Sequence, residues 1–157
     1  MSGTEPKTKP KKVLAIASGG GHWIELLRLR PAFEDHKVTY ATVQADYRST
    51  IGDEPLYIVP DATQWQPVKS LWLAVRMLVV VVRVWPDVVI STGAAPGYFG
   101  VLFGKLLGAK TIWVDSLANV EELSRAGRMA KRFADLWLTQ WAELEEADGP
   151  RYFGSVV

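Results

Sequence analysis

The stretch Ser18-Gly19-Gly20-Gly21-His22-Trp23 decides how this chain begins to fold. It follows the apolar run 13–17 and precedes the helix-patterned segment 24–29. A parallel strand that is buried on both faces is continuously apolar, and glycines let the backbone adopt positive φ and approach a ligand closely. The stretch therefore predicts a strand, a tight turn and a helix N-terminus, whose free N–H groups can bind an anion.

Two common nucleotide-binding motifs are absent from this turn. The dinucleotide fingerprint G-x-G-x-x-G requires a further glycine where the chain has Trp23 and its neighbours, and no G-K-[ST] follows. The alternative is that residues 19–21 form only a tight turn. His22 favours a functional site, because an imidazole titrates near neutral pH and is costly beside an anion site unless it is used.

Composition indicates a single globular domain that does not bind nucleic acid through overall charge. The 157 residues are 48% hydrophobic, and 18 basic residues nearly balance 17 acidic ones. The absence of cysteine excludes disulfides and thiolate chemistry. We expect residues 1–11 to form a flexible basic tail and residues 12–157 to form the domain. No signal peptide is expected, because the apolar run after the basic start is too short.

The apolar segment 87–91 leads into a second turn rich in small residues, Thr92-Gly93-Ala94-Ala95-Pro96-Gly97-Tyr98, and then into a helix to about Leu107. This repeats the order of strand, small-residue turn and helix N-terminus. Turns at the carboxyl ends of parallel strands can face one crevice, where ligands of open α/β sheets bind. We therefore expect the two turns to share a ligand.

The remaining segments continue an alternation of strands and helices. It predicts an α/β fold, a Rossmann-like parallel sheet with helices on both faces. Residues 47–55 are predicted to be a polar loop, and Pro31 is expected to end the first helix early. Strands are expected at 38–43, 56–59, 111–114 and 135–139, helices at 22–33, 65–85 and 128–133, and a last helical turn from Gln140.

Segment 65–85 has the most unusual composition of the chain. Residues 71–84 are apolar except for two arginines, and the four valines 79–82 would suit a strand, but the length of the run favours a helix. Such a helix is too short to span a bilayer. One interpretation is a buried crossover helix whose cations extend outward, and the other is a helix in a membrane interface. The cations recur every seven residues among tryptophans, a mix that the buried helix leaves unexplained. Both interpretations stay open, and the candidate lipid contacts are Trp65, Lys69, Trp72, Arg76 and Arg83.

Several motifs together resemble one family, the acceptor-binding halves of split GT-B glycosyltransferases. The chain is similar to the membrane-associated subunit of the two-part UDP-N-acetylglucosamine transferase of dolichol-linked oligosaccharide synthesis. It also resembles bacterial exopolysaccharide and capsule subunits and, more distantly, the N-terminal domain of the peptidoglycan lipid I glycosyltransferase, whose glycine loops hold a lipid diphosphate. The motifs are Ser18-Gly-Gly-Gly-His22, Pro86-Asp87-Val-Val-Ile-Ser-Thr-Gly93, Val114-Asp115-Ser116, Leu123-Ser124 with Gly127-Arg128, and Ala134-Asp135 with Gln140-Trp141.

The resemblance implies a partner and a membrane. A GT-B enzyme needs a second Rossmann-like domain for the nucleotide sugar, so a separate donor-binding subunit is expected to complete a heterodimer. The eukaryotic subunit carries a transmembrane anchor, whereas here we expect peripheral attachment at the cytoplasmic face of the inner membrane. The apolar chain end predicts the partner interface, with self-packing on the sheet as the alternative; its residues are Tyr152, Phe153, Val156 and Val157.

The implied reaction transfers a hexosyl or glucuronosyl group from a nucleotide sugar, expected to be UDP-linked, to a polyprenyl diphosphate-linked saccharide in exopolysaccharide or capsule biosynthesis. The attacking hydroxyl needs a base, for which His22 is the first candidate and Asp115 its rival; His22 could instead bind phosphate. No metal or cofactor is expected. The acceptor diphosphate is assigned to Ser18, Gly19, Gly20, Gly21, Gly93, Gly97 and Tyr98, and the acceptor sugar to Ser116 and Asn119.

Two other classes remain open. The chain could be a non-catalytic scaffold that recruits and activates the donor-binding subunit, in which case His22 would be dispensable. It could also be a stand-alone nucleotide-binding Rossmann module. The missing glycine argues against that module, as does the lack of a strong acidic candidate for a ribose after the second strand, where only Asp46 is available.

Overall fold

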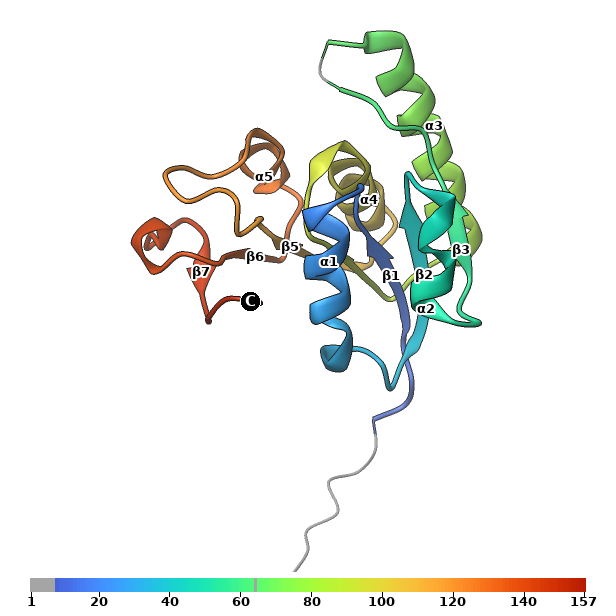
Figure 1. Ribbon diagram of the computed structural model, residues 1–157, viewed down its shortest axis with the longest axis horizontal. Coiled ribbons are helices and arrows are strands. Elements are labelled where there is room, and N and C mark those ends of the chain that lie inside the picture. Colours follow the sequence, from blue (N-terminus) through green and yellow to red (C-terminus); the bar gives the residue numbers. More distant parts are fainter. Residues whose placement is uncertain (1–7, 64) are drawn as a thin grey trace, which may run out of the picture.

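A computed structural model describes residues 8–63 and 65–157. Its seven strands form one parallel sheet in the order β3-β2-β1-β4-β5-β6-β7 (Figure 1). The strand order extends in opposite directions from the central pair β1 and β4, as in a doubly wound sheet. The strands are β1 (Lys12–Ile16), β2 (Lys37–Thr42), β3 (Leu56–Ile58), β4 (Val88–Ser91), β5 (Lys110–Val114), β6 (Leu136–Thr139) and β7 (Arg151–Tyr152).

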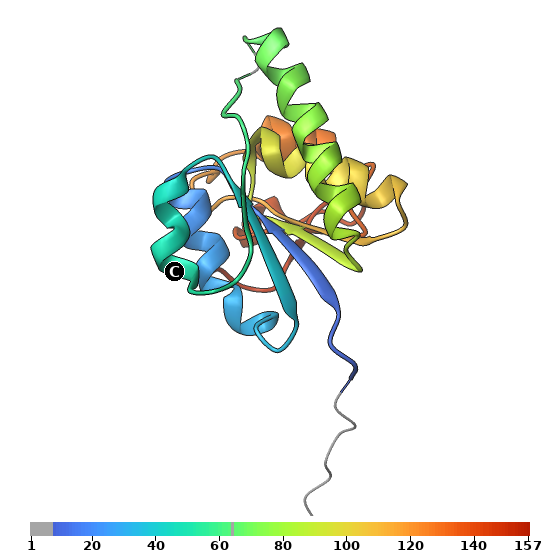
Figure 2. The ribbon, with the colours of Figure 1, turned by 90° about the vertical axis from the view of Figure 1, so that its right-hand side faces the viewer.

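Helices cover both faces of the sheet, as predicted (Figures 1 and 2). One face carries α1 (Gly21–Arg28) and α2 (Arg48–Ile51), and the other carries α3 (Pro67–Val84), α4 (Ala94–Leu106) and α5 (Arg125–Ala130). Short 3-10 turns occur at η1 (Arg30–Ala32), η2 (Ala45–Tyr47) and η3 (Ala142–Leu144).

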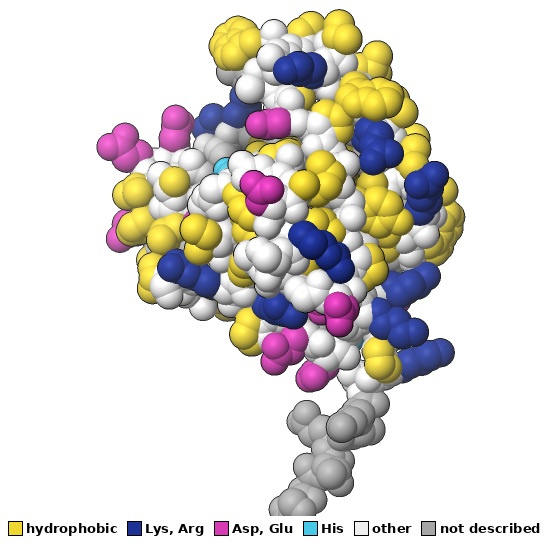
Figure 3. All heavy atoms as spheres, turned by 45° about the vertical axis from the view of Figure 1, so that its right-hand side comes forward, with side chains coloured by type: hydrophobic (Ala, Val, Ile, Leu, Met, Phe, Trp, Pro, Cys, Tyr) yellow, Lys and Arg dark blue, Asp and Glu magenta, His cyan; other side chains and the backbone are white. Residues whose placement is uncertain are grey.

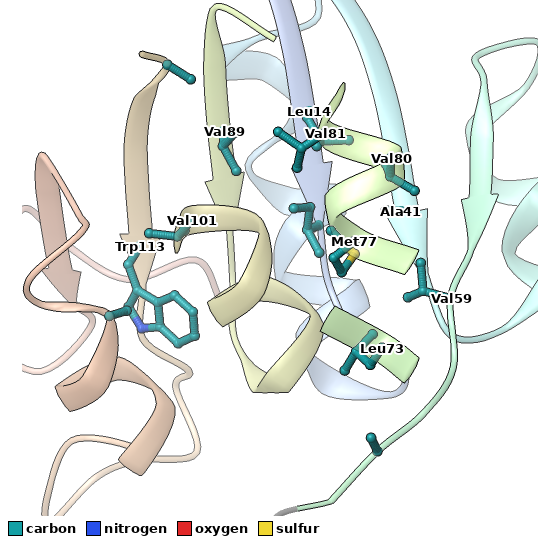
Figure 4. Packing of buried hydrophobic residues seen from close by; sticks show 14 residues of the cluster. Leu14, Ala41, Val59, Leu73, Met77, Val80, Val81, Val89, Val101 and Trp113 are labelled. Atoms are coloured by element: carbon teal, nitrogen blue, oxygen red, sulfur yellow. The ribbon is translucent and has the colours of Figure 1, made fainter. Parts of the chain in front are cut away.

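Side chains of β1 alternate between two cores, because successive residues of a strand point to opposite faces. Val13 and Ala15 join Trp23 and Leu26 of α1 in one core. On the other face, the buried side chains gather between the sheet and the helices α3 and α4 (Figure 4). That core contains Leu14, Ile16, Met77, Val81, Val89, Val101 and Trp113.

Helix α3 confirms the helical prediction for the valine-rich segment. It buries only Leu73, Met77, Val80 and Val81, and its first turns extend beyond the carboxyl edge of the sheet (Figures 1 and 2). It ends at Val84, and the following residue, Trp85, has a left-handed backbone (φ 46°) and precedes a proline. No helix within the described residues is long and apolar enough to cross a bilayer.

Several local predictions differ from the structure. The polar segment 47–55 is not a loop throughout, because η2 and α2 occupy residues 45–51. The helix expected at 128–133 begins at Arg125, since the Ser124 hydroxyl accepts a hydrogen bond from the Gly127 N–H and caps it. Strand β7 was not predicted. The first helix ends at Arg28, in line with the expected effect of Pro31. Of the predicted tail, residues 1–7 lie outside the described residues.

Candidate functional site

The two glycine turns lie side by side at the carboxyl edge of the sheet. Strands β1 and β4 are parallel neighbours, with Ile16 paired to Ser91, so the turns that follow them leave the sheet at the same level. This is also the point where the strand order reverses direction, since β2 flanks β1 and β5 flanks β4. Open α/β sheets bind ligands at such a point.

Hydrogen bonds in both directions join the two turns. The Thr92 hydroxyl donates to the backbone oxygen of His22 at 2.6 Å, and His22 Nδ1 lies 3.0 Å from the Thr92 carbonyl oxygen. A carbonyl oxygen only accepts, so this contact places a proton on Nδ1 and leaves Nε2 of the neutral ring as its basic nitrogen. The orientation of the His22 imidazole is therefore fixed by the second turn and not by the helix to which His22 belongs.

Gly93 has to be glycine for His22 to occupy this position. Its φ of 139° and ψ of −176° belong to a region that only glycine adopts readily. A Cβ atom at Gly93 would lie 2.7 Å from the imidazole of His22. The second turn thus supplies both the carbonyl that orients the imidazole and the space that the ring fills.

The segment after β2 forms a wall beside the first turn, a feature that the sequence did not reveal. The Tyr47 hydroxyl accepts a hydrogen bond from the Gly20 N–H at 2.8 Å, and the Tyr47 ring stacks on Trp23 with centroids 4.8 Å apart. A Cβ at Gly19 would lie 2.7 Å from the amide nitrogen of Gln44. A tyrosine in a polar segment carries no periodic signal, so only the fold brings it to the turn.

Beneath Trp23 lies a second aromatic ring. The Tyr40 ring meets Trp23 edge to face at 5.6 Å, and its hydroxyl is buried without a partner among the described residues. Burial raises the pKa of Tyr40 to about 12, and the nearby Glu54 carboxylate raises it as well. Tyr40 therefore stays neutral and serves as a packed support for the indole.

Asp115 lies at the carboxyl end of β5, as predicted, but it is 1% exposed. Its Oδ1 accepts hydrogen bonds from Trp113 Nε1 and the Ser124 hydroxyl, and its Oδ2 accepts from the Ser124 N–H and Asn119 Nδ2. Both carboxylate oxygens are thus engaged in holding the loop between β5 and α5. Asn119, a predicted sugar ligand, is one of the groups that hold it.

Glu25 is a buried carboxylate that sequence reasoning missed. Its Oε1 accepts hydrogen bonds from the Ser116 hydroxyl at 3.1 Å and from the Leu117 N–H at 2.8 Å, which ties α1 to the end of β5. Its Oε2 has no hydrogen-bond partner among the described residues. Ser116, predicted to bind the acceptor sugar, is therefore engaged with Glu25.

Two other predicted diphosphate ligands lie on α4. A Cβ at Gly97 would come within 1.9 Å of the Ser91 hydroxyl oxygen, so this glycine allows the helix to approach the sheet closely. The Tyr98 ring packs edge to face on Phe99 and Phe133. It also lines a surface hollow of about 430 Å³ beside α5. None of these neighbours belongs to the His22 turn.

The Alg14 family model, described as "Oligosaccharide biosynthesis protein Alg14 like", matches residues 59–156. The chain belongs to the Alg14-like family. The human UDP-N-acetylglucosamine transferase subunit ALG14 is 30% identical over 169 residues, which is 85% of this chain and 77% of the human protein. The Eremothecium gossypii protein of the same name is 28% identical over 181 residues, covering 94% of this chain and 81% of its own length.

Solved structures resemble this Alg14-like chain in fold. MurG of Acinetobacter baumannii superposes with a TM-score of 0.77 at 16% identity, over 94% of this chain. A UDP-N-acetylglucosamine 2-epimerase of Rickettsia bellii gives 0.69 at 15% identity, also over 94%. The chain spans 46% of each of those longer proteins. The predicted Rossmann-like half of a GT-B fold is confirmed, whereas the likeness to bacterial exopolysaccharide subunits stays a prediction.

The outer face of α3 in this Alg14-like chain is apolar and exposed. Val68 and Leu71 are 81% and 68% exposed, and apolar side chains lie among lysines and arginines along this side of the molecule (Figure 3). Lys69 and Arg83 are exposed, whereas Arg76 is half-buried and donates to the Ile58 carbonyl oxygen at 3.2 Å. The other exposed apolar residues on this face or flanking the helix are the predicted Trp65 and Trp72 together with Val75, Leu78, Val82 and Trp85.

The chain end packs back onto the domain in part, and its role as the partner interface stays a prediction. Val156 folds back, because its carbonyl oxygen accepts from Arg28 and its N–H donates to the Gln140 side chain. Phe153 and Val157 are 79% and 83% exposed, and Tyr152 is partly exposed on the edge strand β7. One residue is therefore anchored to the domain while its apolar neighbours remain available.

Proposed function

We propose that this chain is the acceptor-binding subunit of a two-component glycosyltransferase. It would present a polyprenyl diphosphate-linked saccharide to a donor-binding GT-B half that carries a nucleotide sugar. The main support for this proposal is the pair of glycine turns, which the His22–Thr92 hydrogen bonds join at the point where the strand order of the sheet reverses. The name of the relatives, UDP-N-acetylglucosamine transferase subunit, supports a UDP-linked donor and N-acetylglucosamine as the first sugar to test.

The diphosphate is proposed to lie against the first turn. The N–H groups of Gly21 and His22 begin α1, where backbone N–H groups have no earlier helical carbonyl to bond, and the helix dipole favours negative charge there. A Cβ at Gly20 or Gly21 would meet nothing within 4 Å, so the space outside the turn is open. A phosphate oxygen can therefore approach these N–H groups.

His22 is proposed as the base. With its proton on Nδ1 held by the Thr92 carbonyl, Nε2 accepts the proton of the attacking acceptor hydroxyl. The hydroxyl oxygen then bonds to the anomeric carbon of the donor sugar, and the bond from that carbon to UDP breaks with its electron pair leaving on UDP. Asp115 is the weaker candidate, because its two oxygens already accept four hydrogen bonds.

Membrane and partner contacts are proposed for surfaces that the catalytic turns do not use. The exposed apolar face of α3, with Lys69 and Arg83, suits an interface with anionic lipid, and a lipid-linked acceptor requires a site near a membrane. Phe153 and Val157 suit contact with the donor-binding subunit. We propose that the product serves exopolysaccharide or capsule assembly, because the sequence Gly19-Gly20-Gly21-His22-Trp23 resembles that of subunits from those pathways.

Reconstitution tests the proposal. The chain is mixed with a donor-binding GT-B half, UDP-N-acetylglucosamine and a polyprenyl diphosphate-sugar, and transfer is measured by chromatography of the lipid product. We expect turnover only with both subunits present. Robust transfer by this chain alone would contradict a two-component enzyme.

The two histidines of the chain offer a matched pair of variants. His22→Ala should lower kcat by about 10²- to 10⁴-fold with little change in acceptor KM, the usual contribution of a positioned base. His36→Ala removes the other histidine, whose Nδ1 accepts from the Lys11 N–H at the opposite edge of the sheet, and should behave as wild type. A raised KM with intact kcat would instead make His22 a phosphate ligand.

Two alternatives give different results in the same assays. If the chain is a non-catalytic scaffold, the complex that contains the His22→Ala variant should transfer sugar at the wild-type rate. A stand-alone nucleotide-binding module would bind UDP-sugars or NAD without a partner, which titration calorimetry on the isolated chain would detect.

A further inference from the structure

We propose that Tyr47 is a positioning residue for the first glycine turn, fixed in place by Trp23. This inference rests on the proposed function, since the turn it positions is the one assigned to the acceptor diphosphate. Tyr47 lies outside every motif that the sequence singled out, and it acts on the backbone of Gly20 and not on the ligand.

Contacts with Trp23 and Thr50 hold Tyr47 against the first turn. Its ring stacks on the Trp23 indole at 4.8 Å with the planes 5° apart, an arrangement that aromatic pairs favour when offset. The Thr50 hydroxyl connects the same two residues, because it accepts from Trp23 Nε1 at 3.2 Å and donates to the Tyr47 carbonyl oxygen at 2.6 Å. The Tyr47 hydroxyl is thereby held 2.8 Å from the Gly20 nitrogen.

Gly20 needs an external constraint. Its φ of 65° and ψ of −132° lie where residues with a side chain are strained, and glycine itself moves freely among many backbone conformations. No side chain caps α1 among the described residues, and the local bonds of Gly20 are those that its carbonyl oxygen accepts from the Trp23 and Ile24 N–H groups. These bonds leave the Gly20 N–H itself without a local partner. The bond from the Gly20 N–H to Tyr47 sets the orientation of the Gly19–Gly20 peptide within the first turn.

The same contacts account for Trp23. A dinucleotide-binding turn has a glycine at this part of the motif, which lets the helix approach the strand. Here the indole fills that space, is 2% exposed, and lies between Tyr40 and Tyr47. Trp23 therefore links the core of the α1 face to the side chain that holds the turn.

Tyr47→Phe tests the proposal, with Tyr57→Phe on strand β3 as the matched control. The phenylalanine keeps the ring on Trp23 and removes only the hydroxyl. Amide hydrogen exchange of the full-length chain, read by NMR, should become about three- to tenfold faster at Gly20, the range of one lost hydrogen bond. The melting temperature should stay close to that of wild type, and Tyr57→Phe should change neither quantity.

In the reconstituted complex, Tyr47→Phe should raise the acceptor KM by a similar factor of about three to ten and leave the KM for the nucleotide sugar unchanged. Wild-type exchange at Gly20, or an unchanged acceptor KM, would overturn the proposal. A lower melting temperature with both KM values unchanged would also overturn it, because Tyr47 would then only stabilise the fold. The exchange measurement needs no partner, so failure of the wild-type complex to transfer sugar would reject the proposed function separately.

Discussion

Replacing Gly93 with alanine should damage turnover far more than it damages the fold. The new Cβ would lie 2.7 Å from the His22 imidazole, whereas ordinary Cβ contacts begin at 3.4 Å. The ring would therefore have to move by about 0.7 Å, and misplacement of a reacting group on the order of 1 Å can cost about 10²-fold in rate. Such a movement would also break the 3.0 Å contact between Nδ1 and the Thr92 carbonyl oxygen.

The energetic cost to the fold can be separated from the catalytic cost. Alanine at φ 139° is strained, which should lower the free energy of unfolding by about 1–3 kcal/mol. Gly108→Ala is the matched control, because Gly108 also has positive φ (86°) but a Cβ there would meet nothing within 4 Å. Both variants should lose stability in urea unfolding, and only Gly93→Ala should lose about 10²-fold in kcat.

Two results would refute this reasoning. Wild-type kcat in Gly93→Ala would mean that the position of the imidazole does not matter to transfer. An equal loss of kcat in Gly108→Ala would mean that backbone strain anywhere in the domain impairs activity. The kinetics should be measured below the melting temperature of each variant, so that unfolding does not enter the rate.

Replacing both Lys69 and Arg83 with glutamine should lower binding to anionic liposomes by about 30-fold, as measured by sedimentation, since each cation near such a surface contributes about 1 kcal/mol. Glutamine at Arg132 and Arg151, at the far end of the sheet from α3, is the control; equal losses in both variants would reject a role for α3. Asp135→Asn should cost less than about 1 kcal/mol near pH 7: the Lys105 ammonium and the Thr111 N–H hold the pKa of Asp135 below its ordinary value, and solvent screens this exposed ion pair. A lowered pKa stabilises the fold above the unfolded-state pKa, so the wild-type advantage in urea unfolding should begin to fall below about pH 4 and be lost as pH falls through the folded-state pKa; an advantage that rises as pH is lowered from 7 would contradict this.

Much of the fold was encoded locally. Continuous apolar runs predicted the central strands, and small-residue turns after β1 and β4 predicted two helix starts in the right places. The segment with four consecutive valines was correctly predicted as a helix from its length. The polar segment containing α2 was missed, because a four-residue helix is too short to show a periodic pattern.

For the candidate site, the sequence by itself determined which side chains and glycines stand at the ends of strands, since strand, turn and helix are set by neighbouring residues. Only the tertiary structure decided what each of them faces. It brought His22 to Thr92 across 70 positions and Glu25 to Ser116 across 91. It also enclosed Asp115 in hydrogen bonds and placed Tyr47 against Gly20. Such contacts depend on which strands become neighbours, and strand order is a property of the packed sheet that no local pattern carries.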